Sequence, residues 1–310
     1  MPRKKKTIIE QTPDEQTDIT QHIGISDIQQ NITTPVDELS ESGNTADTIE
    51  RATSVIIHEE AHKKFKTAPP LISARNIGFT YGTNTVLHNV SEEIYAHETY
   101  IIMGASGCGK STFLKMIAGL TYPSEGEVTI HSVNLNTAKK HELINMHQRN
   151  SFIFQDSALI ANMRIFDNVA LPLRYHFPDL PESEIKIRVE SVLDRVGLNR
   201  NDYLHLPAQL SLGERKLAAF ARGLIIHPEI LYCDEPLSSL DRRVAARVLS
   251  LIKDFKKSGG TSIIITHSLP MALDIGDRLT IFKAGQIIAC ASPKKVVKLK
   301  NPYIQEIIGI

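Results

Sequence analysis

One short segment constrains this chain more than any other feature of its sequence. Residues Gly104–Ser111 read G-A-S-G-C-G-K-S and match the phosphate-binding pattern G-x-x-x-x-G-K-[ST]. The segment follows an apolar run at 100–103 and precedes a predicted helix at 110–119, which is the strand–loop–helix setting that the pattern needs. Its glycines let the backbone curl, so that amide N–H groups and the positive end of the helix dipole can face an anion. The alternative, a glycine-rich turn ending in a surface lysine, fits this setting less well.

The side chains at the end of this segment have separate expected tasks. Lys110 would place a positive charge against the β- and γ-phosphates, and the Ser111 hydroxyl would bind Mg²⁺. The residues predicted to surround the phosphates are Gly104, Ser106, Gly107, Cys108, Gly109, Lys110, Ser111 and Thr112.

A second constraint is an apolar strand that ends in two carboxylates. Residues 230–236 read I-L-Y-C-D-E-P, so that Asp234 and Glu235 follow a continuously apolar run. Beside a phosphate-binding loop, Asp234 would organise Mg²⁺ or its water, and Glu235 would reach the attacking water as a general base. The alternative is a strand-end turn with two solvated acids, which the presence of the loop makes the weaker interpretation.

From Leu71 onward, predicted strands alternate with predicted helices, which is typical of an α/β domain. Runs such as 230–233 and 262–265 are apolar throughout, as expected of central parallel strands covered on both faces. We expect strands at 71–79, 85–95, 99–103, 126–131, 151–154, 229–234, 261–266, 278–283 and 286–290. We expect helices at 110–119, 182–196, 213–226, 241–257 and 293–299, with residues 156–226 as a helical insertion.

Residues 1–70 differ from the rest of the chain. They are rich in Gln, Thr, Asp, Glu and Ser, which predicts a largely disordered polar extension with a short helix at 46–66. Within it, His58–His62 reads H-E-E-A-H and matches the zinc-protease pattern H-E-x-x-H. Because a zinc protease also needs a third ligand and a folded cleft, we interpret this segment as a solvated helix and expect no zinc.

Charge and cysteine content exclude several classes of protein. Lys plus Arg and Asp plus Glu both number 35, and a net charge of zero argues against nucleic acid as a partner of the whole chain. The three cysteines lie far apart and offer neither a disulfide framework nor zinc spacing, so we expect a reducing, cytoplasmic setting. No apolar run approaches the roughly 20 residues that a membrane-spanning helix needs.

Further segments, taken in order, resemble the motifs of ATP-binding cassette (ABC) ATPases. Leu210–Glu214 (L-S-L-G-E) resembles the L-S-G-G-Q signature, and Ser238–Asp241 (S-S-L-D) resembles the D-loop. Gln155 resembles the Q-loop glutamine, His267 the switch histidine, and Tyr81 the aromatic residue that stacks on adenine. Each of these residues alone would be interpreted as structural, and their order and spacing together carry the resemblance.

This resemblance implies a P-loop NTPase (RecA-like) ABC nucleotide-binding domain, of the α/β class, over residues 71–310. A β-subdomain is expected near 71–100 and a helical subdomain at about 156–226. The implied activity is hydrolysis of ATP, with Mg²⁺ as cofactor, at a composite site in a homodimer. In such a dimer, the phosphate-binding loop of one subunit faces Ser211 and Gly213 of the other.

The resemblance also implies roles for individual residues. The catalytic residues would be Glu235, His267 and Gln155. Mg²⁺ would be held by Ser111, Gln155 and Asp234. Nucleotide contacts from outside the phosphate-binding loop would come from Tyr81, Ser211, Gly213 and Asp241. The chain departs from the family pattern at Leu212 and Glu214, which replace a glycine and a glutamine of the signature, and at Leu217, where the family often has arginine.

A narrower resemblance concerns the transported substance. Phe154–Leu159, followed by Phe166–Arg174, is similar to the ATPase subunits of Mla-type (MCE-associated) phospholipid transporters. It implies a separate integral-membrane permease, an MCE-type protein as partner, and a place on the cytoplasmic face of the inner membrane. Arg164, Phe166 and Arg174 would then contact the permease. The alternative is the ATPase of a lipoprotein-release or small-solute import system.

Overall fold

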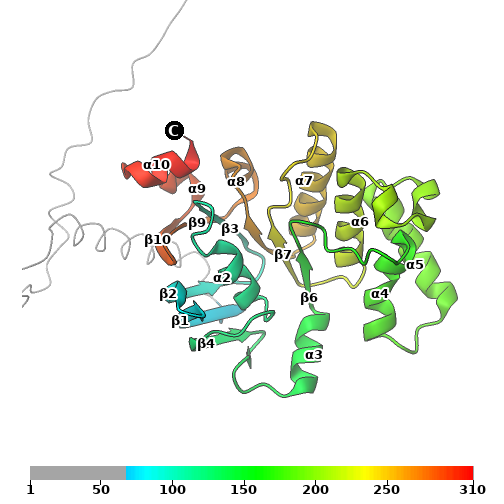
Figure 1. The fold of residues 1–310 in the computed structure, drawn as a ribbon, viewed down its shortest axis with the longest axis horizontal. Helices are drawn as coiled ribbons and strands as arrows, with labels where there is room; N and C mark the ends of the chain where they lie inside the picture. Colours follow the sequence, from blue (N-terminus) through cyan, green and yellow to red (C-terminus); the bar gives the residue numbers. More distant parts are fainter. Residues whose placement is uncertain (1–67, 310) are drawn as a thin grey trace, which may run out of the picture. The chain divides into compact units, whose positions relative to one another are not determined.

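The computed structural model describes residues 68–309. These residues form two β-sheets flanked by helices, with a separate group of helices at one end (Figure 1). The alternation of strands and helices confirms the predicted α/β class. The expectations for residues 1–66, namely the polar extension, its short helix and the H-E-x-x-H segment, lie outside the described residues. Within 68–309, no helix has the length and apolar character needed to cross a membrane.

The central sheet contains six strands in the order β10-β9-β3-β8-β7-β6. They are β3 (Thr99–Gly104), β6 (Asn150–Ile153), β7 (Ile230–Asp234), β8 (Thr261–Ile265), β9 (Arg278–Lys283) and β10 (Gln286–Ala291). All are parallel except β10, which runs antiparallel beside β9. The carboxyl ends of the parallel strands therefore meet at one edge, where the phosphate-binding loop follows β3 and Asp234 ends β7.

Helices pack on both faces of the central sheet and at one end of it. They are α2 (Lys110–Ile117), α3 (Lys140–Gln148), α4 (Ile165–His176), α5 (Glu182–Val196), α6 (Leu212–Leu224), α7 (Arg242–Lys257), α8 (Leu269–Ile275), α9 (Pro293–Val296) and α10 (Pro302–Ile308), with short 3-10 helices η3 (Arg200–Leu204) and η4 (Pro207–Gln209).

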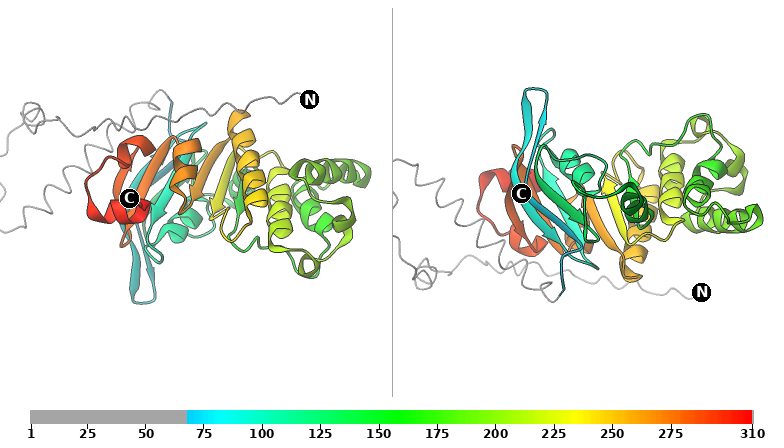
Figure 2. Two further views of the ribbon diagram at one scale, coloured as in Figure 1. Left: turned by 90° about the horizontal axis from the view of Figure 1, so that it is seen from above. Right: turned by 90° about the horizontal axis from the view of Figure 1, so that it is seen from below.

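A smaller antiparallel sheet has the strand order β2-β1-β4-β5. Its strands are β1 (Ile72–Tyr81), β2 (Asn84–Ile94), β4 (Glu125–Ile130) and β5 (Val133–Asn134). Figure 2 shows the β1–β2 hairpin, coloured cyan, extending away from the central sheet. The sheet thus includes strands well beyond the range near 71–100 that was expected for a β-subdomain.

The central sheet separates two apolar cores, because successive side chains of a strand point to opposite faces. Ile102 and Tyr232 belong to the core shared with α2 and the smaller sheet. Ile101 and Leu231, their neighbours in sequence, belong to the core shared with α7, α8 and the helical end. Burial on both faces explains why these strands are continuously apolar in sequence.

Helices α4, α5 and α6 form the helical end of the molecule, at the opposite side of the central sheet from α9 and α10 (Figure 1). Their facing sides are fully buried at Val169 and Leu173 of α4, Val189 and Leu193 of α5, and Phe220 of α6. These helices lie within residues 156–226, the range in which a helical insertion was expected.

Outside the expected helical insertion, the helices α3, α8 and α10 of residues 68–309 were not predicted, and within it α4 was not predicted as a separate helix. Helices α8 and α10 carry a proline in their first turn, at Pro270 and Pro302. Proline is tolerated there because the first backbone N–H groups of a helix have no partner within it. In a sequence the same prolines resemble loop punctuation, which is why these short helices were not predicted.

Candidate active site

The phosphate-binding loop lies between β3 and α2 in a conformation that requires glycine. Gly104 and Gly109 have φ angles of 156° and 101°. A Cβ atom at Gly104 would lie 2.5 Å from the Phe282 carbonyl oxygen, and one at Gly109 would lie 2.9 Å from the Leu87 side chain. Because both positions combine positive φ with close packing, the loop cannot keep this curl with larger residues. The curl turns the loop toward a cavity.

Lys110 is buried and is held by its own loop. Its Nζ donates hydrogen bonds to the carbonyl oxygens of Gly104, at 2.9 Å, and Ala105, at 2.7 Å. The ammonium group is therefore positioned across the mouth of the loop, where a phosphate group could replace those carbonyl acceptors. Cys108, by contrast, is buried among the apolar side chains beneath the loop, and this burial raises the pKa of its thiol.

Ser111 and Asp234 meet across the loop, although they are far apart in sequence. The Ser111 hydroxyl donates a hydrogen bond of 3.2 Å to Asp234 Oδ1. Asp234 is 6% exposed, and burial raises the pKa of its carboxyl group, a shift that the Ser111 hydrogen bond opposes. The hydroxyl and the carboxylate together form a suitable pair of oxygen ligands for Mg²⁺. Burial disfavours the ionised form of the carboxyl group, and a bound cation would stabilise that form.

Glu235 is approached by the two side chains that were predicted to act with it. Gln155 Nε2 donates a 3.1 Å hydrogen bond to Glu235 Oε2, and His267 Nε2 lies 3.3 Å from Glu235 Oε1. Glu235 itself has a φ angle of 46°, in the left-handed region that is costly for a residue other than glycine. This arrangement can hold a carboxylate in one orientation at the carboxyl edge of the sheet, as general-base chemistry requires.

A cavity of about 350 Å³ joins these groups. It is lined by Val86, Ser106, Gly107, Gly109, Lys110, Ser111, Thr112, Gln155 and Glu235. His267 lies on the far side of Glu235, at an adjoining cavity of about 230 Å³. The structure thus brings together the predicted loop residues, Gln155 and Glu235 at one surface, with Asp234 and His267 immediately beside them.

The signature residues do not line this cavity, and they build the start of α6 instead. Ser211 is the N-cap of α6: its Oγ accepts a hydrogen bond from Glu214 N, and Glu214 Oε2 accepts one from Ser211 N at 2.8 Å. A Cβ atom at Gly213 would lie 2.9 Å from Val244 on α7, so glycine lets these helices pack closely. Leu212, which replaces a glycine of the family pattern, is 39% exposed.

Asp241 and Tyr81 are also absent from the cavity wall. Asp241 caps α7, with Oδ1 accepting hydrogen bonds from the backbone N–H groups of Arg243 and Val244 at 2.8 and 3.0 Å. Tyr81 ends β1 at the tip of the hairpin and is 78% exposed. Its ring is therefore free to meet a ligand, but no contact in the described residues holds it over the loop.

Two basic residues of α6 were missed by the sequence interpretation. Lys216 donates to the carbonyl oxygens of Phe154 and Gln155, and Arg222 donates to those of Ser157 and Ala158. Ser157 and Ala158 have left-handed φ angles of 69° and 43°, so the segment that carries Gln155 is tightly turned. The available signal was the position of both cations within the apolar run of α6, a pattern that predicts burial with polar partners.

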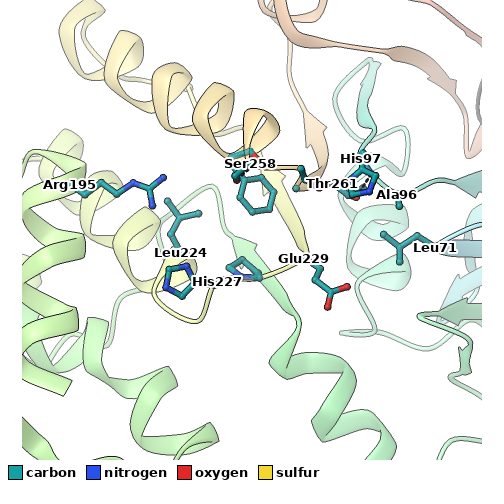
Figure 3. A pocket seen from close by; sticks show the side chains of 13 residues that line it. Leu71, Ala96, His97, Arg195, Leu224, His227, Glu229, Ser258 and Thr261 are labelled. Atoms are coloured by element: carbon teal, nitrogen blue, oxygen red, sulfur yellow. Dashed lines mark hydrogen bonds between the residues drawn. The ribbon is translucent and has the colours of Figure 1, made fainter. Parts of the chain in front are cut away.

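A larger cavity, of about 440 Å³, lies elsewhere in the molecule (Figure 3). Its wall includes His97 before β3, Glu229 before β7 and Thr261 at the start of β8, so it lies at the amino ends of the central strands. Glu229 is paired there with Arg149, at 2.7 Å. None of the predicted phosphate or metal ligands lines this cavity, and the candidate site is therefore the smaller one beside the phosphate-binding loop.

Comparison with known proteins gives relatives over most of the chain. Residues 87–238 match the family model described as "ABC transporter". The methionine import ATP-binding protein MetN of Clostridioides difficile is 34% identical over 242 residues, which cover 77% of this chain and 74% of that protein. The spermidine/putrescine import ATP-binding protein PotA of Nitrosomonas eutropha is 36% identical over 242 residues, covering 77% of this chain and 64% of that protein.

The fold also has relatives among solved structures. A dimeric structure of the ATP-binding cassette MJ0796 in a post-hydrolysis state, bound to ADP and Pi, superposes with a TM-score of 0.68 at 30% sequence identity. The match covers 72% of this chain and 98% of that one. A relative of 34% identity that the chain covers over 74% of its length, together with this fold, leads to one conclusion. The chain belongs to the ABC transporter family, as one of its ATP-hydrolysing, ATP-binding subunits.

Proposed function

We propose that the cavity beside the phosphate-binding loop is the site of ATP hydrolysis, with Glu235 as its general base. The convergence of Gln155 and His267 on the two oxygens of one carboxylate is the observation that carries this proposal. Lys110 and the loop amides bind the phosphate chain, Glu235 accepts a proton from the attacking water, and His267 holds the other side of that carboxylate. Tyr81 stacks on the adenine ring from the tip of the hairpin.

The chemistry of the ligands fits Mg²⁺ as the metal of this site. The Ser111 hydroxyl, the Asp234 carboxylate and the side-chain oxygen of Gln155 are the hard oxygen ligands that this ion prefers, and Ser111 and Asp234 already lie 3.2 Å apart. Bound there, the ion would neutralise part of the phosphate charge. Asp234 keeps its place because it ends a strand that is buried along its whole length.

The signature residues enter the reaction through a second copy of the chain. Ser211 and Gly213 lie at the exposed start of α6, outside their own cavity, while Asp241 caps the neighbouring helix. A head-to-tail homodimer would place them against the nucleotide of the partner. The solved cassette structure described above is a dimer bound to ADP and Pi, which supports this arrangement.

We propose that the chain energises the import of a small solute through a separate membrane permease, on the cytoplasmic face of the membrane. The support comes from the relatives, which are methionine and spermidine/putrescine import ATP-binding proteins. Small-solute import was the alternative interpretation of the sequence, and the comparisons favour it over phospholipid transport.

Phospholipid transport with an MCE-type partner is the second candidate, supported by the Phe154–Arg174 segment. Packing accounts for much of that pattern. Asn168 is fully buried, and its side chain holds the preceding loop through hydrogen bonds to Ile160 and Met163. Arg174 is engaged with Asp167 and Glu182 at 3.0 and 2.9 Å, which leaves Arg164 as the exposed member of the proposed permease contact.

The test is to purify the chain with the membrane protein that accompanies it and to reconstitute the complex in vesicles. ATP-dependent uptake of labelled methionine or spermidine would support the import proposal. ATP-dependent movement of labelled phospholipid, with an MCE protein in the complex and no solute uptake, would replace it by the second candidate. The matched control is the Lys110→Ala variant of the same complex, which should lose ATP binding and either form of transport.

A further inference from the structure

Lys216 is a charged residue that the ATPase site as described so far does not use. It lies on α6 and is 1% exposed. Its Nζ donates hydrogen bonds to the carbonyl oxygens of Phe154, at 3.1 Å, and Gln155, at 2.6 Å. Among residues 68–309 its hydrogen-bond partners are these two carbonyl oxygens, and no carboxylate forms an ion pair with it.

A buried ammonium group without a carboxylate partner is unfavourable unless its hydrogen bonds are needed. Burial lowers the pKa of Lys216, while the negative charges of nearby groups, among them Asp156, Asp234 and Glu235, oppose that shift. The hydrogen bonds of its ammonium group go to the two carbonyl oxygens and not to those carboxylates. An apolar side chain would suit the surrounding core better. The hydrogen bonds to the two carbonyl oxygens therefore account for the presence of a lysine at this position.

These contacts fix the backbone from which the Gln155 side chain reaches Glu235. The Gln155 amide donates its 3.1 Å bond to Glu235 Oε2 from a residue whose own carbonyl is held by Lys216. Arg222, later on the same helix, holds the carbonyls of Ser157 and Ala158 at 2.9 and 2.7 Å. Helix α6 thus holds the segment after β6 by hydrogen bonds at both of its ends. Of the two basic residues, Lys216 lies nearer to the reacting groups.

The same helix begins at the signature. Ser211 caps α6, and in the proposed dimer Ser211 and Gly213 contact the nucleotide of the partner. A helix is rigid over such a short distance, so a shift of its first turn also moves the Lys216 ammonium. One element therefore contacts the partner's nucleotide at its start and the chain's own Gln155 a few residues later.

We propose that Lys216 is a positioning residue for ATP hydrolysis, which ties the Gln155 backbone to the signature helix so that the two ATP sites of the dimer act together. This inference rests on the proposed dimeric ATPase function. Lys216 does not line the cavity beside the phosphate-binding loop. It acts through Gln155, whose amide sets the orientation of Glu235.

The test compares Lys216→Met with Lys216→Arg in the full-length protein with its permease. Methionine keeps the length of the side chain and removes the charge, whereas arginine keeps donors for the carbonyl oxygens. We expect Lys216→Met to lower kcat by about 10–100-fold, the range expected for misplacement of a catalytic group. The KM of the variant for ATP should change little. Its Hill coefficient for ATP should fall toward 1, because ATP binding at one site would no longer affect the other site. Lys216→Arg should recover much of both.

Arg222→Met is the matched control, because Arg222 lies on the same helix and holds the same segment but does not contact residue 155. It should lower kcat less than Lys216→Met and keep the Hill coefficient. A double-mutant cycle with Gln155→Ala separates positioning from general damage. If Lys216 acts through Gln155, adding Lys216→Met to Gln155→Ala should cost little more activity.

Additive losses in that cycle, or a Hill coefficient that stays at its wild-type value in Lys216→Met, would overturn the inference. If Lys216→Met fails to fold, judged by its melting temperature, the cycle is repeated with Lys216→Gln, which keeps a donor without charge. Failure of the proposed function would look different: the wild-type complex itself would show no ATP hydrolysis or no cooperativity in ATP.

Discussion

Charged side chains have opposite arrangements at the two ends of the parallel strands of the central sheet. The amino ends of these strands form the amino edge, and their carboxyl ends form the carboxyl edge. At the amino edge, Arg278 at the start of β9 is fully buried with Glu92 and Glu98. Its guanidinium donates to Glu92 Oε1 and Glu98 Oε2, each at 3.0 Å. Tyr100 extends the network with a 3.0 Å hydrogen bond to Glu92. These charged groups satisfy one another away from solvent.

At the carboxyl edge, Lys110 and Glu235 line a cavity, and Asp234 lies beside them. Lys110 donates to backbone carbonyls, Asp234 accepts from a hydroxyl, and Glu235 accepts from the Gln155 amide with the His267 ring 3.3 Å away. Within residues 68–309 neither Asp234 nor Glu235 is paired with an arginine, so these carboxylates stay available to a cation. The charged groups at the amino edge are therefore satisfied by one another, whereas those at the carboxyl edge remain available for chemistry.

The largest expected effect is loss of catalysis at the carboxyl edge. Glu235→Gln should lower kcat for ATP by about 10²–10⁴-fold, because it removes the general base. ATP binding should persist, and Mg-ATP should hold the dimer closed. The measurements are steady-state ATPase rate and gel-filtration size. Glu229→Gln, at the other edge, is the control and should hydrolyse ATP normally. Near-normal turnover in Glu235→Gln would contradict the role of Glu235.

The next effect is loss of stability at the amino edge. Arg278→Met leaves Glu92 and Glu98 buried without their cation, and such changes cost about 3–5 kcal/mol in the free energy of unfolding. Denaturant unfolding measures it. The control is Arg149→Met, which breaks the exposed pair with Glu229 and should cost about 0–1 kcal/mol. Equal losses in both variants would show that burial of the Arg278 network contributes nothing extra.

A smaller effect concerns pH. Burial raises the pKa of Glu98 above its ordinary value, and the charge of Arg278 opposes this shift. At pH values between the ordinary glutamate pKa and the raised one, the folded state keeps a proton on Glu98 that the unfolded state has released. The free energy of unfolding therefore falls as the pH rises through this interval. Glu98→Gln should remove this slope. Unfolding free energies at several pH values test the sign, and an unchanged slope in the variant would assign the titration to another group.

The smallest effect is expected at the signature segment, Leu210–Glu214. In the proposed dimer this segment would face the carboxyl edge of a second copy of the chain. Leu212→Gly should preserve or raise ATPase activity, because glycine lets the backbone approach the partner's γ-phosphate more closely. Since Leu212 is the first residue of α6, the change should cost about 0.5–1 kcal/mol of stability at most. Activity and melting temperature are measured together. A severe loss of turnover without unfolding would show that Leu212 makes a specific contact.

Much of the fold and of the site could be predicted, because residues that are close in the sequence determine these features. The apolar runs that become β7 and β8 are buried on both faces, so their side chains show no alternation. The glycines of the phosphate-binding loop are required by backbone angles that other residues rarely adopt. Asp234 and Glu235 follow directly from the end of a strand. In each case the physical constraint acts between residues that are close in sequence.

Other features depend on contacts between segments far apart in the chain. Only the tertiary structure brings Gln155 and His267 to the two oxygens of Glu235, places Lys216 under the Gln155 backbone, and buries Arg278 with Glu92 and Glu98. A buried cation and a solvated one look alike in sequence. What distinguishes them is the set of carbonyl and carboxylate groups that packing brings within hydrogen-bond distance, because a buried charge must be satisfied by its surroundings.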